Sequence, residues 1–255
     1  MATRAEGDYA VLIAGGTKGI GRAIALRLAR PGARLFLNYR GDDRAAATAA
    51  EQVRARGATP HVIREDIGTV RGAAAVIDAV GAATDHLDVL VHSAAIPSAG
   101  ALAAQPLDEI AECLAIGGTA LLYLVQPAMR LLRAGSSVLF LSGGSVDLVL
   151  PHHGALAAAK ALGECFVRYL AIECAPRGVN FNTLRTGPVD TGLLRALRGA
   201  AAGDGPVAPV TPDGRRLTLE QIAETAAFLV SPAASMIRGQ SVMVDGGLST
   251  TVRAT

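Results

Sequence analysis

Two lysines and a run of glycines are the residues of this chain that point most directly to chemistry. The chain has 24 basic residues, and only Lys18 and Lys160 are lysine. Lys18 lies in a turn between an apolar run and an amphipathic stretch, and this turn reads Gly15-Gly16-Thr17-Lys18-Gly19-Ile20-Gly21. Glycine lets the backbone approach a pyrophosphate, and the N–H groups at a helix N-terminus face its negative charge. The order of strand, turn and helix predicts a dinucleotide site; an ordinary glycine-rich turn is the alternative.

The second lysine belongs to a segment that could transfer protons. Lys160 follows His153 by seven residues within a stretch of helical pattern. Seven residues are close to two helical turns, so the two side chains would share a face at roughly 10 Å along the axis. Imidazole exchanges protons near neutral pH, which makes His153 a candidate acid or base. His152 is the alternative, and both histidines could instead be loop residues without a role.

Two serines near the end of the preceding strand are further candidates. Ser142 or Ser145 could donate a hydrogen bond to a substrate carbonyl, and we take Ser142 as the candidate. The alternative is that both hydroxyls only satisfy their own turn backbone.

Composition excludes several classes of protein. The 255 residues are 51% hydrophobic and carry a net charge of +2, which gives no electrostatic reason to expect nucleic acid as a partner. Three cysteines, Cys113, Cys165 and Cys174, lie in apolar helical patterns and predict buried thiols rather than disulfides or metal ligands. Without a signal-like apolar start or a run of 18 apolar residues, we expect a cytoplasmic protein with no membrane partner.

Strand-like and helical patterns alternate along the whole chain. Strands are expected near 9–13, 34–38, 61–64, 88–91, 137–141, 179–183 and 241–244, and helices near 20–30, 43–56, 70–81, 107–133, 154–175 and 218–230. This alternation predicts an α/β fold, a Rossmann-like doubly wound parallel sheet of about seven strands with helices on both faces. We expect one domain over 1–255. The segment 193–216 is either a substrate lid or a plain surface loop.

With these elements in place, five stretches in the right order resemble the short-chain dehydrogenase/reductase family. They are the glycine turn at 14–21, Asp66-Ile67, His92-Ser93-Ala94-Ala95, the stretch 186–191, and the C-terminal stretch from Ile237-Arg238-Gly239-Gln240 through Val244-Asp245-Gly246-Gly247. The resemblance implies that the dinucleotide is held by Gly15, Thr17, Lys18, Gly19, Ile20, Gly21, Tyr39, Arg40, Asp66, Ile67, Ser93, Ala94, Ala95, Lys160, Gly187, Val189 and Thr191.

The second strand favours NADP(H) over NAD(H). An NAD enzyme usually ends this strand with a carboxylate that binds the ribose 2′-OH and repels a 2′-phosphate. Here the strand ends in Asn38-Tyr39-Arg40, and the first acids are Asp42 and Asp43. Lys18 and Arg40 could both reach a 2′-phosphate. A solvated loop charge is the alternative role for Arg40.

The catalytic segment departs from the family pattern. The family carries Tyr-x-x-x-Lys, in which the tyrosine moves the proton and the lysine holds the nicotinamide ribose; the residue four before Lys160 is Leu156. The family's serine and asparagine positions fall on Gly143 and Gly117. Some enoyl-acyl-carrier-protein reductases of this family use Tyr-x6-Lys, which places His153 at the tyrosine position. The stretches 118–126 and 234–240 also look like those enzymes.

Two functions follow as expectations. The first is an NADPH-dependent reductase of an enoyl or keto thioester or a related biosynthetic intermediate, with His153, Lys160 and Ser142 at the reacting end. Its substrate would be a small molecule, and a carrier-protein or CoA thioester is one candidate. The second is a non-redox lyase, cyclase or isomerase, or a cofactor-binding protein without turnover. Apolar helices over 107–133 and 154–175 predict a homotetramer, with a homodimer as the alternative.

Overall fold

Seven apolar segments form one parallel sheet in the described part of the chain, which is residues 9–198 and 208–250 of a computed structural model. The strands are β1 (Tyr9–Ala14), β2 (Ala33–Tyr39), β3 (Thr59–Arg64), β4 (Leu87–His92), β5 (Leu132–Gly143), β6 (Asn180–Thr186) and β7 (Ser241–Val244). Their order is β3-β2-β1-β4-β5-β6-β7. Both β1 and β4 are buried along their whole length. Strands covered on both faces read as continuous apolar runs, which is why the sequence predicts them well.

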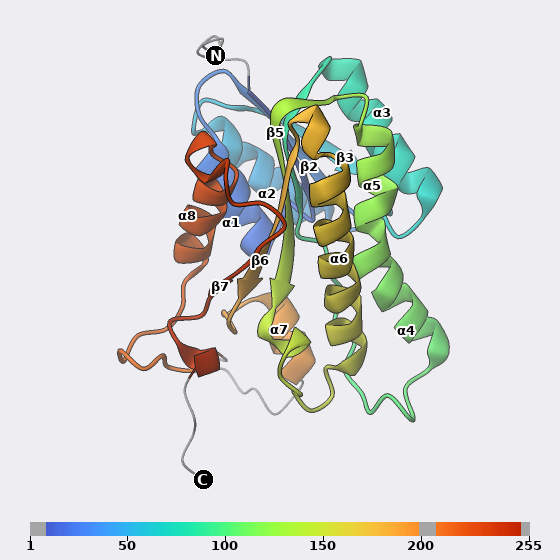
Figure 1. The fold of residues 1–255 in the computed structure, drawn as a ribbon, viewed down its shortest axis with the longest axis vertical. Helices are drawn as coiled ribbons and strands as arrows, with labels where there is room; N and C mark the ends of the chain where they lie inside the picture. The colour runs from blue at the N-terminus through green and yellow to red at the C-terminus, as the bar shows by residue number, and fades with distance from the viewer. Residues whose placement is uncertain (1–8, 199–207, 251–255) are drawn as a thin grey trace.

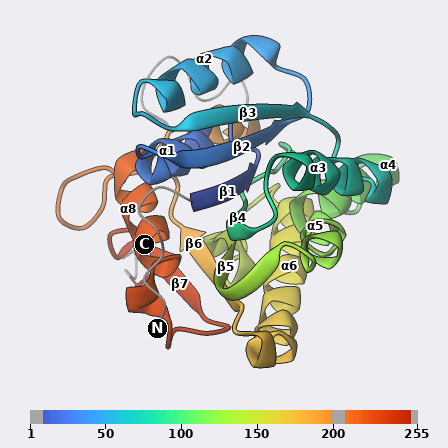
Figure 2. The same cartoon turned by 90° about the horizontal axis from the view of Figure 1, so that it is seen from above.

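Helices cover both faces of the sheet, which confirms the predicted fold class (Figures 1 and 2). On one face lie α1 (Gly19–Leu28), α2 (Asp43–Arg54) and α8 (Leu219–Leu229). On the other lie α3 (Val70–Ala83), α5 (Ala120–Ala128) and α6 (Gly154–Glu173). Each face has its own apolar core. The strand order reverses between β1 and β4, and ligands of such sheets bind outside the carboxyl ends of the strands at that point.

The helix expected over 107–133 is interrupted, so that prediction was wrong in its detail. It begins as α4 (Leu107–Leu114), passes through a π-helical turn at Ala115–Thr119, and ends as α5 at Ala128. The turn contains Gly118, where a Cβ would lie 2.5 Å from the backbone oxygen of Ala159 in α6. Glycine at this position thus lets the backbone of the π-turn lie directly against α6. Leu107–Ala128 is apolar and long enough to cross a membrane by length and composition alone, but α5 packs on α3 and the π-turn packs on α6.

The start of the segment predicted as a lid is helical. Helix α7 (Gly192–Arg198) follows β6 at the carboxyl end of the sheet (Figure 1). Residues 199–207 of that segment lie outside the described residues. The lid over 193–216 and the single domain over 1–255 therefore stay predictions.

Substitution of Gly118 by alanine tests the contact between the π-turn and α6. We expect Gly118→Ala to lower the free energy of unfolding by about 1–3 kcal/mol, because the added Cβ meets backbone that cannot move aside. The matched control is Gly81→Ala in α3, where the nearest atom would be 3.5 Å away. This control should leave stability unchanged or raise it by up to ~1 kcal/mol. Equal effects of the two variants in urea unfolding would contradict the account.

Candidate active site

The glycine turn after β1 is shaped by its neighbours and leaves one side open. Gly15 has φ +76°, and a Cβ there would lie 2.9 Å from the backbone of Ala94; a Cβ on Gly21 would lie 2.1 Å from the carbonyl oxygen of Gly15. These two glycines are required by the turn itself. Gly19 has φ +50°, and its Cβ would meet only Thr191, at 3.5 Å. The backbone at Gly19 is thus the part of the turn that a ligand can approach.

The helix that follows this turn begins without a side-chain cap. Its N-cap residue is Lys18, whose side chain accepts no backbone hydrogen bond. In contrast, Asp42, Thr69 and Thr218 cap α2, α3 and α8. The first N–H groups of a helix need partners, and an anion can supply them. The N-terminus of α1 therefore fits a phosphate group.

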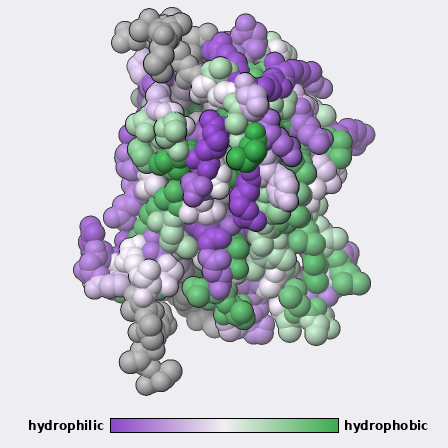
Figure 3. All heavy atoms as spheres, in the orientation of Figure 1, coloured by the Kyte–Doolittle hydropathy of each residue, from purple (hydrophilic) through white to green (hydrophobic). Residues whose placement is uncertain are grey.

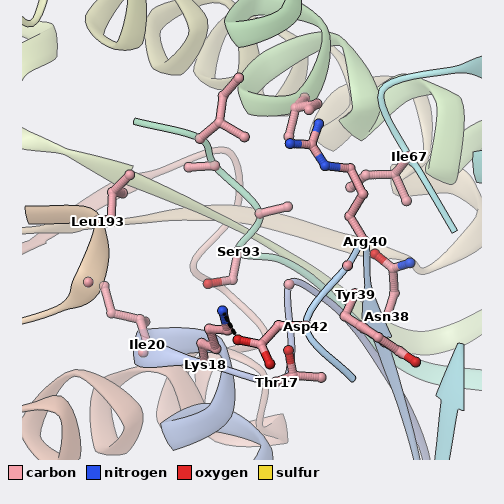
Figure 4. A pocket seen from close by; sticks show the side chains of 18 of the residues that line it. Thr17, Lys18, Ile20, Asn38, Tyr39, Arg40, Asp42, Ile67, Ser93 and Leu193 are labelled. Atoms are coloured by element: carbon pink, nitrogen blue, oxygen red, sulfur yellow. Dashed lines mark ion pairs between the residues drawn. The ribbon is translucent and has the colours of Figure 1, made fainter. Parts of the chain in front are cut away.

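A cavity of about 520 Å³ lies at this turn, at the carboxyl ends of β1, β2 and β4 (Figure 4). Most of the residues predicted to hold the dinucleotide line it, which are Gly15, Thr17, Lys18, Gly19, Ile20, Tyr39, Arg40, Asp66, Ile67, Ser93, Ala94, Ala95 and Thr191. Four predicted residues are not among its lining residues, namely Gly21, Lys160, Gly187 and Val189. The volume and the open backbone suit an adenine nucleotide.

Asn38 is a residue of this site that the sequence analysis missed. It is buried in β2 and lines the cavity. Its backbone oxygen accepts hydrogen bonds from Gly15 and Gly16, both at 3.1 Å, and its side-chain amide donates to the carbonyl of Glu65 at 3.0 Å. Asn38 therefore holds the glycine turn against β2 and the end of β3. An amide directly after the apolar run Leu35-Phe36-Leu37 was the available signal.

Two cations lie at the cavity, each beside an acid. The Lys18 ammonium forms an ion pair with Asp42, and both groups are substantially exposed (Figure 4). Lys18 and the backbone N–H of Ala45 hold the pKa of Asp42 below its usual range. Arg40 Nη1 lies 2.5 Å from Glu112 Oε1, and 3.9 Å from Asp66 Oδ2. Strand β2 ends at Tyr39 without a carboxylate, and the first acid after it, Asp42, is the partner of Lys18.

Lys160 is buried below the π-turn. Its Nζ donates to the carbonyl oxygen of Gly117 at 3.3 Å and lies 4.8 Å from the centre of the Phe140 ring. Burial lowers the pKa of Lys160 to about 8. Ile116, the neighbour of Gly117, lines the cavity. The π-turn thus contacts both the cavity and the buried amine.

His153 stands at the N-cap of α6 in a defined orientation. Its Nδ1 lies 2.8 Å from the carbonyl oxygen of Pro151. A carbonyl can only accept, so Nδ1 carries the proton and Nε2 is left to exchange one. The carbonyl oxygen of His152 accepts from the N–H of Gly100 at 3.1 Å, which joins the loop before α6 to the loop after β4.

Ser142 belongs to a different set of side chains. Its hydroxyl donates to Glu164 Oε1 at 2.6 Å, and this buried carboxylate also accepts two hydrogen bonds from Arg185, at 2.7 and 2.5 Å. Arg185 also contacts Asp147 in the loop after β5. The structure therefore uses the Ser142 hydroxyl inside a charged network against α6. An arginine near the end of the otherwise uncharged strand β6 was the available signal for this network.

Leu156 and its surroundings are apolar. Leu156 packs with Cys113, Ala155 and Ala159 in a small buried cluster. Aliphatic side chains from the loop after β4, from α4 and from α7 pack against this cluster, namely Ala95, Ile96, Ile110, Leu114 and Leu197. Exposed apolar side chains also gather at this end of the molecule (Figure 3), and they include Leu102, Leu148, Val149 and Leu150. The surroundings of the α6 N-terminus therefore favour an apolar ligand.

Comparison with known proteins identifies the family. The family model described as Enoyl-(Acyl carrier protein) reductase matches residues 14–249. A 1-cyclohexenylcarbonyl-CoA reductase of Streptomyces collinus is 31% identical over 241 residues, which cover 93% of this chain and 86% of that protein. A versicolorin reductase of Emericella nidulans is 26% identical and covers 96% of each chain.

Solved structures give the same result. A short-chain dehydrogenase of Burkholderia cenocepacia in complex with NADP has a TM-score of 0.87 and 29% identity, and covers 98% of this chain and 100% of that one. The chain belongs to the Enoyl-(Acyl carrier protein) reductase family of short-chain dehydrogenases/reductases. It is an oxidoreductase of the short-chain type.

The buried amine of Lys160 makes a prediction about stability and pH. The unfolded lysine holds its proton up to a pKa of about 10.4, whereas the folded one loses it near 8, so the unfolded state binds more protons between these values. Stability of the ligand-free protein should therefore rise with pH in this window, by about 3 kcal/mol in total. Lys160→Met should be more stable than the native chain at pH 7, and this difference should shrink toward pH 10. A difference independent of pH in urea unfolding would contradict the prediction.

Proposed function

We propose that this protein is an NADP(H)-dependent reductase of an enoyl or keto thioester or a related biosynthetic intermediate. The observation that carries the proposal is the end of β2: Arg40 and Lys18 line the cavity where an NAD enzyme has a carboxylate. Two cations next to a cavity that suits an adenine nucleotide would bind a 2′-phosphate by charge and by charge-assisted hydrogen bonds. The NADP complex of the similar Burkholderia protein supports this choice of cofactor.

The chain's residues would divide the cofactor between them. Gly19 and the N-terminus of α1 would bind the pyrophosphate, and Asp66 and Ile67 would contact the adenine. At the other end, Lys160 would hold the nicotinamide ribose, and Gly187, Val189 and Thr191 would face the carboxamide. When bound, NADPH supplies a hydride. The protein would fix the position of the nicotinamide relative to the substrate.

His153 is the residue that we propose to supply or direct the proton. Its Nδ1–H is directed to Pro151, so Nε2 can donate only when the ring is protonated. Protonated His153 would deliver a proton to the substrate and be left neutral, and solvent would return the proton at this partly exposed position. Ser142 is a weaker candidate for a donor because Glu164 accepts its hydroxyl hydrogen.

The missing tyrosine favours conjugate reduction over ketone reduction. Leu156, which stands at the family's tyrosine position, cannot transfer a proton and is packed among aliphatic side chains. Addition of a hydride to an enoyl β-carbon needs mainly positioning and stabilisation of the enolate, so it depends less on a strong acid at that position. The 1-cyclohexenylcarbonyl-CoA reductase from Streptomyces supports an apolar enoyl thioester as the substrate class.

We propose a CoA or carrier-protein thioester as the form of the substrate and a cytoplasmic location. The segment 193–216 would act as the substrate lid of a single domain, with Leu197 of α7 resting on the apolar cluster around Leu156. A homotetramer, or a homodimer, would form through the apolar helices over 107–133 and 154–175.

One observation favours a second function. Among the described residues, the apolar cluster around Leu156 contributes no proton donor other than the thiol of Cys113. A non-redox lyase, cyclase or isomerase that uses His153, or a cofactor-binding protein without turnover, would also fit this arrangement. Consumption of the cofactor separates the two functions.

Cofactor titration tests the first function. The protein should bind NADPH with micromolar affinity and at least about tenfold more tightly than NADH, since each good phosphate contact is charge-assisted. Addition of an α,β-unsaturated thioester should then oxidise the bound NADPH, which its absorbance reports. Tight binding without oxidation over a broad panel of enoyl and keto thioesters would favour the second function. Absence of NADPH binding would contradict both the cofactor and the role of Lys18.

Substitution of His153 tests the proton donor. His153→Ala should lower the rate of reduction about a hundredfold at unchanged NADPH affinity, as loss of a general acid does. His153→Tyr should restore part of the rate if this position faces the substrate. The neighbouring His152 has φ +66°, which asparagine tolerates, so His152→Asn is the matched variant. A loss in His152→Asn together with a normal rate in His153→Ala would show that the role belongs to His152 instead.

A further inference from the structure

The cations at the cavity are balanced by three carboxylates that differ in how they are held. Asp42 pairs with Lys18, whereas Asp66 and Glu112 both face Arg40. Figure 4 shows the side chains of Lys18 and Asp42 directed toward one another, with Arg40 extending away from this pair. A phosphate that enters here must compete with carboxylates for both cations. The affinity for the phosphate therefore depends on how easily a carboxylate can be displaced from its cation.

Two of the three carboxylates are tied to the backbone. Asp42 is the N-cap of α2, and its Oδ1 accepts from the N–H of Ala45 at 2.9 Å. Asp66 accepts from the N–H of Gly68, also at 2.9 Å. Neither can turn away without leaving a backbone donor unpaired, which is costly. These two acids stay in place whatever occupies the cavity.

Among residues 9–198 and 208–250, only Arg40 forms a hydrogen bond or ion pair with the side chain of Glu112. Glu112 projects from α4, and its Oε1 lies 2.5 Å from Arg40 Nη1. Both side chains are half exposed, with 51% of Arg40 and 50% of Glu112 accessible. An exposed ion pair of this kind contributes little to stability, so its carboxylate can return to water at low cost.

We propose that Glu112 is a residue that sets the affinity for the 2′-phosphate by competing for Arg40. The proposal rests on the function proposed above, and it names a residue on α4 that neither the motifs nor the comparisons assign. A 2′-phosphate must displace Glu112 from Arg40, so Glu112 weakens NADPH binding. An unphosphorylated nucleotide leaves the pair intact, so Glu112 has no effect on NADH. Glu112 thereby limits the preference for NADP(H).

The chain offers a matched control on the same helix. Glu109 is also exposed on α4, and its side chain has no hydrogen bond or ion pair to another described residue. Glu112→Gln and Glu109→Gln remove the same charge from the same helix and keep the shape of the side chain. Any difference between them reports the contact with Arg40 rather than the net charge of α4.

Calorimetric titration with two adenosine fragments tests the proposal without any reaction. The probes are 2′,5′-ADP, which carries the 2′-phosphate, and 5′-AMP, which lacks it. Glu112→Gln should tighten 2′,5′-ADP about two- to fivefold, the range that an exposed ion pair gives. It should leave 5′-AMP unchanged, and Glu109→Gln should leave both unchanged. Arg40→Ala should weaken 2′,5′-ADP, and Glu112→Gln added to Arg40→Ala should have no further effect.

The outcomes separate this proposal from the proposed function. Equal gains for Glu112→Gln and Glu109→Gln, or a gain that persists in the Arg40→Ala background, would overturn the role of Glu112 and leave NADP(H) binding intact. Weaker 2′,5′-ADP binding by Glu112→Gln would overturn it as well. Failure of the native chain to bind 2′,5′-ADP and NADPH would overturn the proposed function, and the role of Glu112 with it. Far-ultraviolet circular dichroism of each variant establishes that the fold is retained.

Discussion

The turn after β1 must pack against two neighbouring strands at once, and the rest of the site depends on that contact. The carbonyl of Asn38 in β2 accepts from Gly15 and Gly16, and the N–H of Ser93 after β4 donates to the carbonyl of Ala14, at 2.9 Å. Gly15 has no room for a side chain beside Ala94. The turn is thereby fixed at the point where the strand order reverses. It directs the uncapped N-terminus of α1 toward the cavity, which gives the site an end that suits an anion.

Much of this arrangement could be predicted from the sequence because it depends on local pattern. Buried parallel strands are apolar without interruption, and a glycine-rich turn between such a strand and an amphipathic stretch is typical of a nucleotide site. Spacing and resemblance predict Lys18, Arg40, Ser93 and Thr191 as cofactor-binding residues, and all four line the cavity. Asn38 was missed because its role depends on the neighbouring strands rather than on its own segment.

The less predictable features all depend on contacts between distant segments. The π-turn at Ala115–Thr119 lies directly against α6, and helical periodicity alone cannot report that contact. The hydrogen bond from Ser142 to Glu164 and the pairing of Arg40 with Glu112 join residues that are 22 and 72 positions apart. A single sequence identifies such residues as polar but does not give their partners.

The two ends of the site differ in chemical character. The end at β1 and β2 is polar and holds charges of both signs, and it suits a phosphorylated nucleotide. The end at α6 holds a buried amine, one oriented imidazole and an aliphatic surface around Leu156. In the proposed function, such a surface would exclude water and position an apolar substrate, but it would offer little acid catalysis. Hydride transfer to an activated double bond is the reaction that makes the smallest demand on it.

Deuteride transfer is the measurement that tests this account most directly. NADPH that carries deuterium at the transferable position of the nicotinamide would be mixed with the protein and an α,β-unsaturated thioester, and the product analysed by mass spectrometry. The account predicts a saturated thioester with one deuterium on the β-carbon and one equivalent of NADP formed. Recovery of unlabelled product, or of unchanged thioester with NADPH bound and intact, would contradict it.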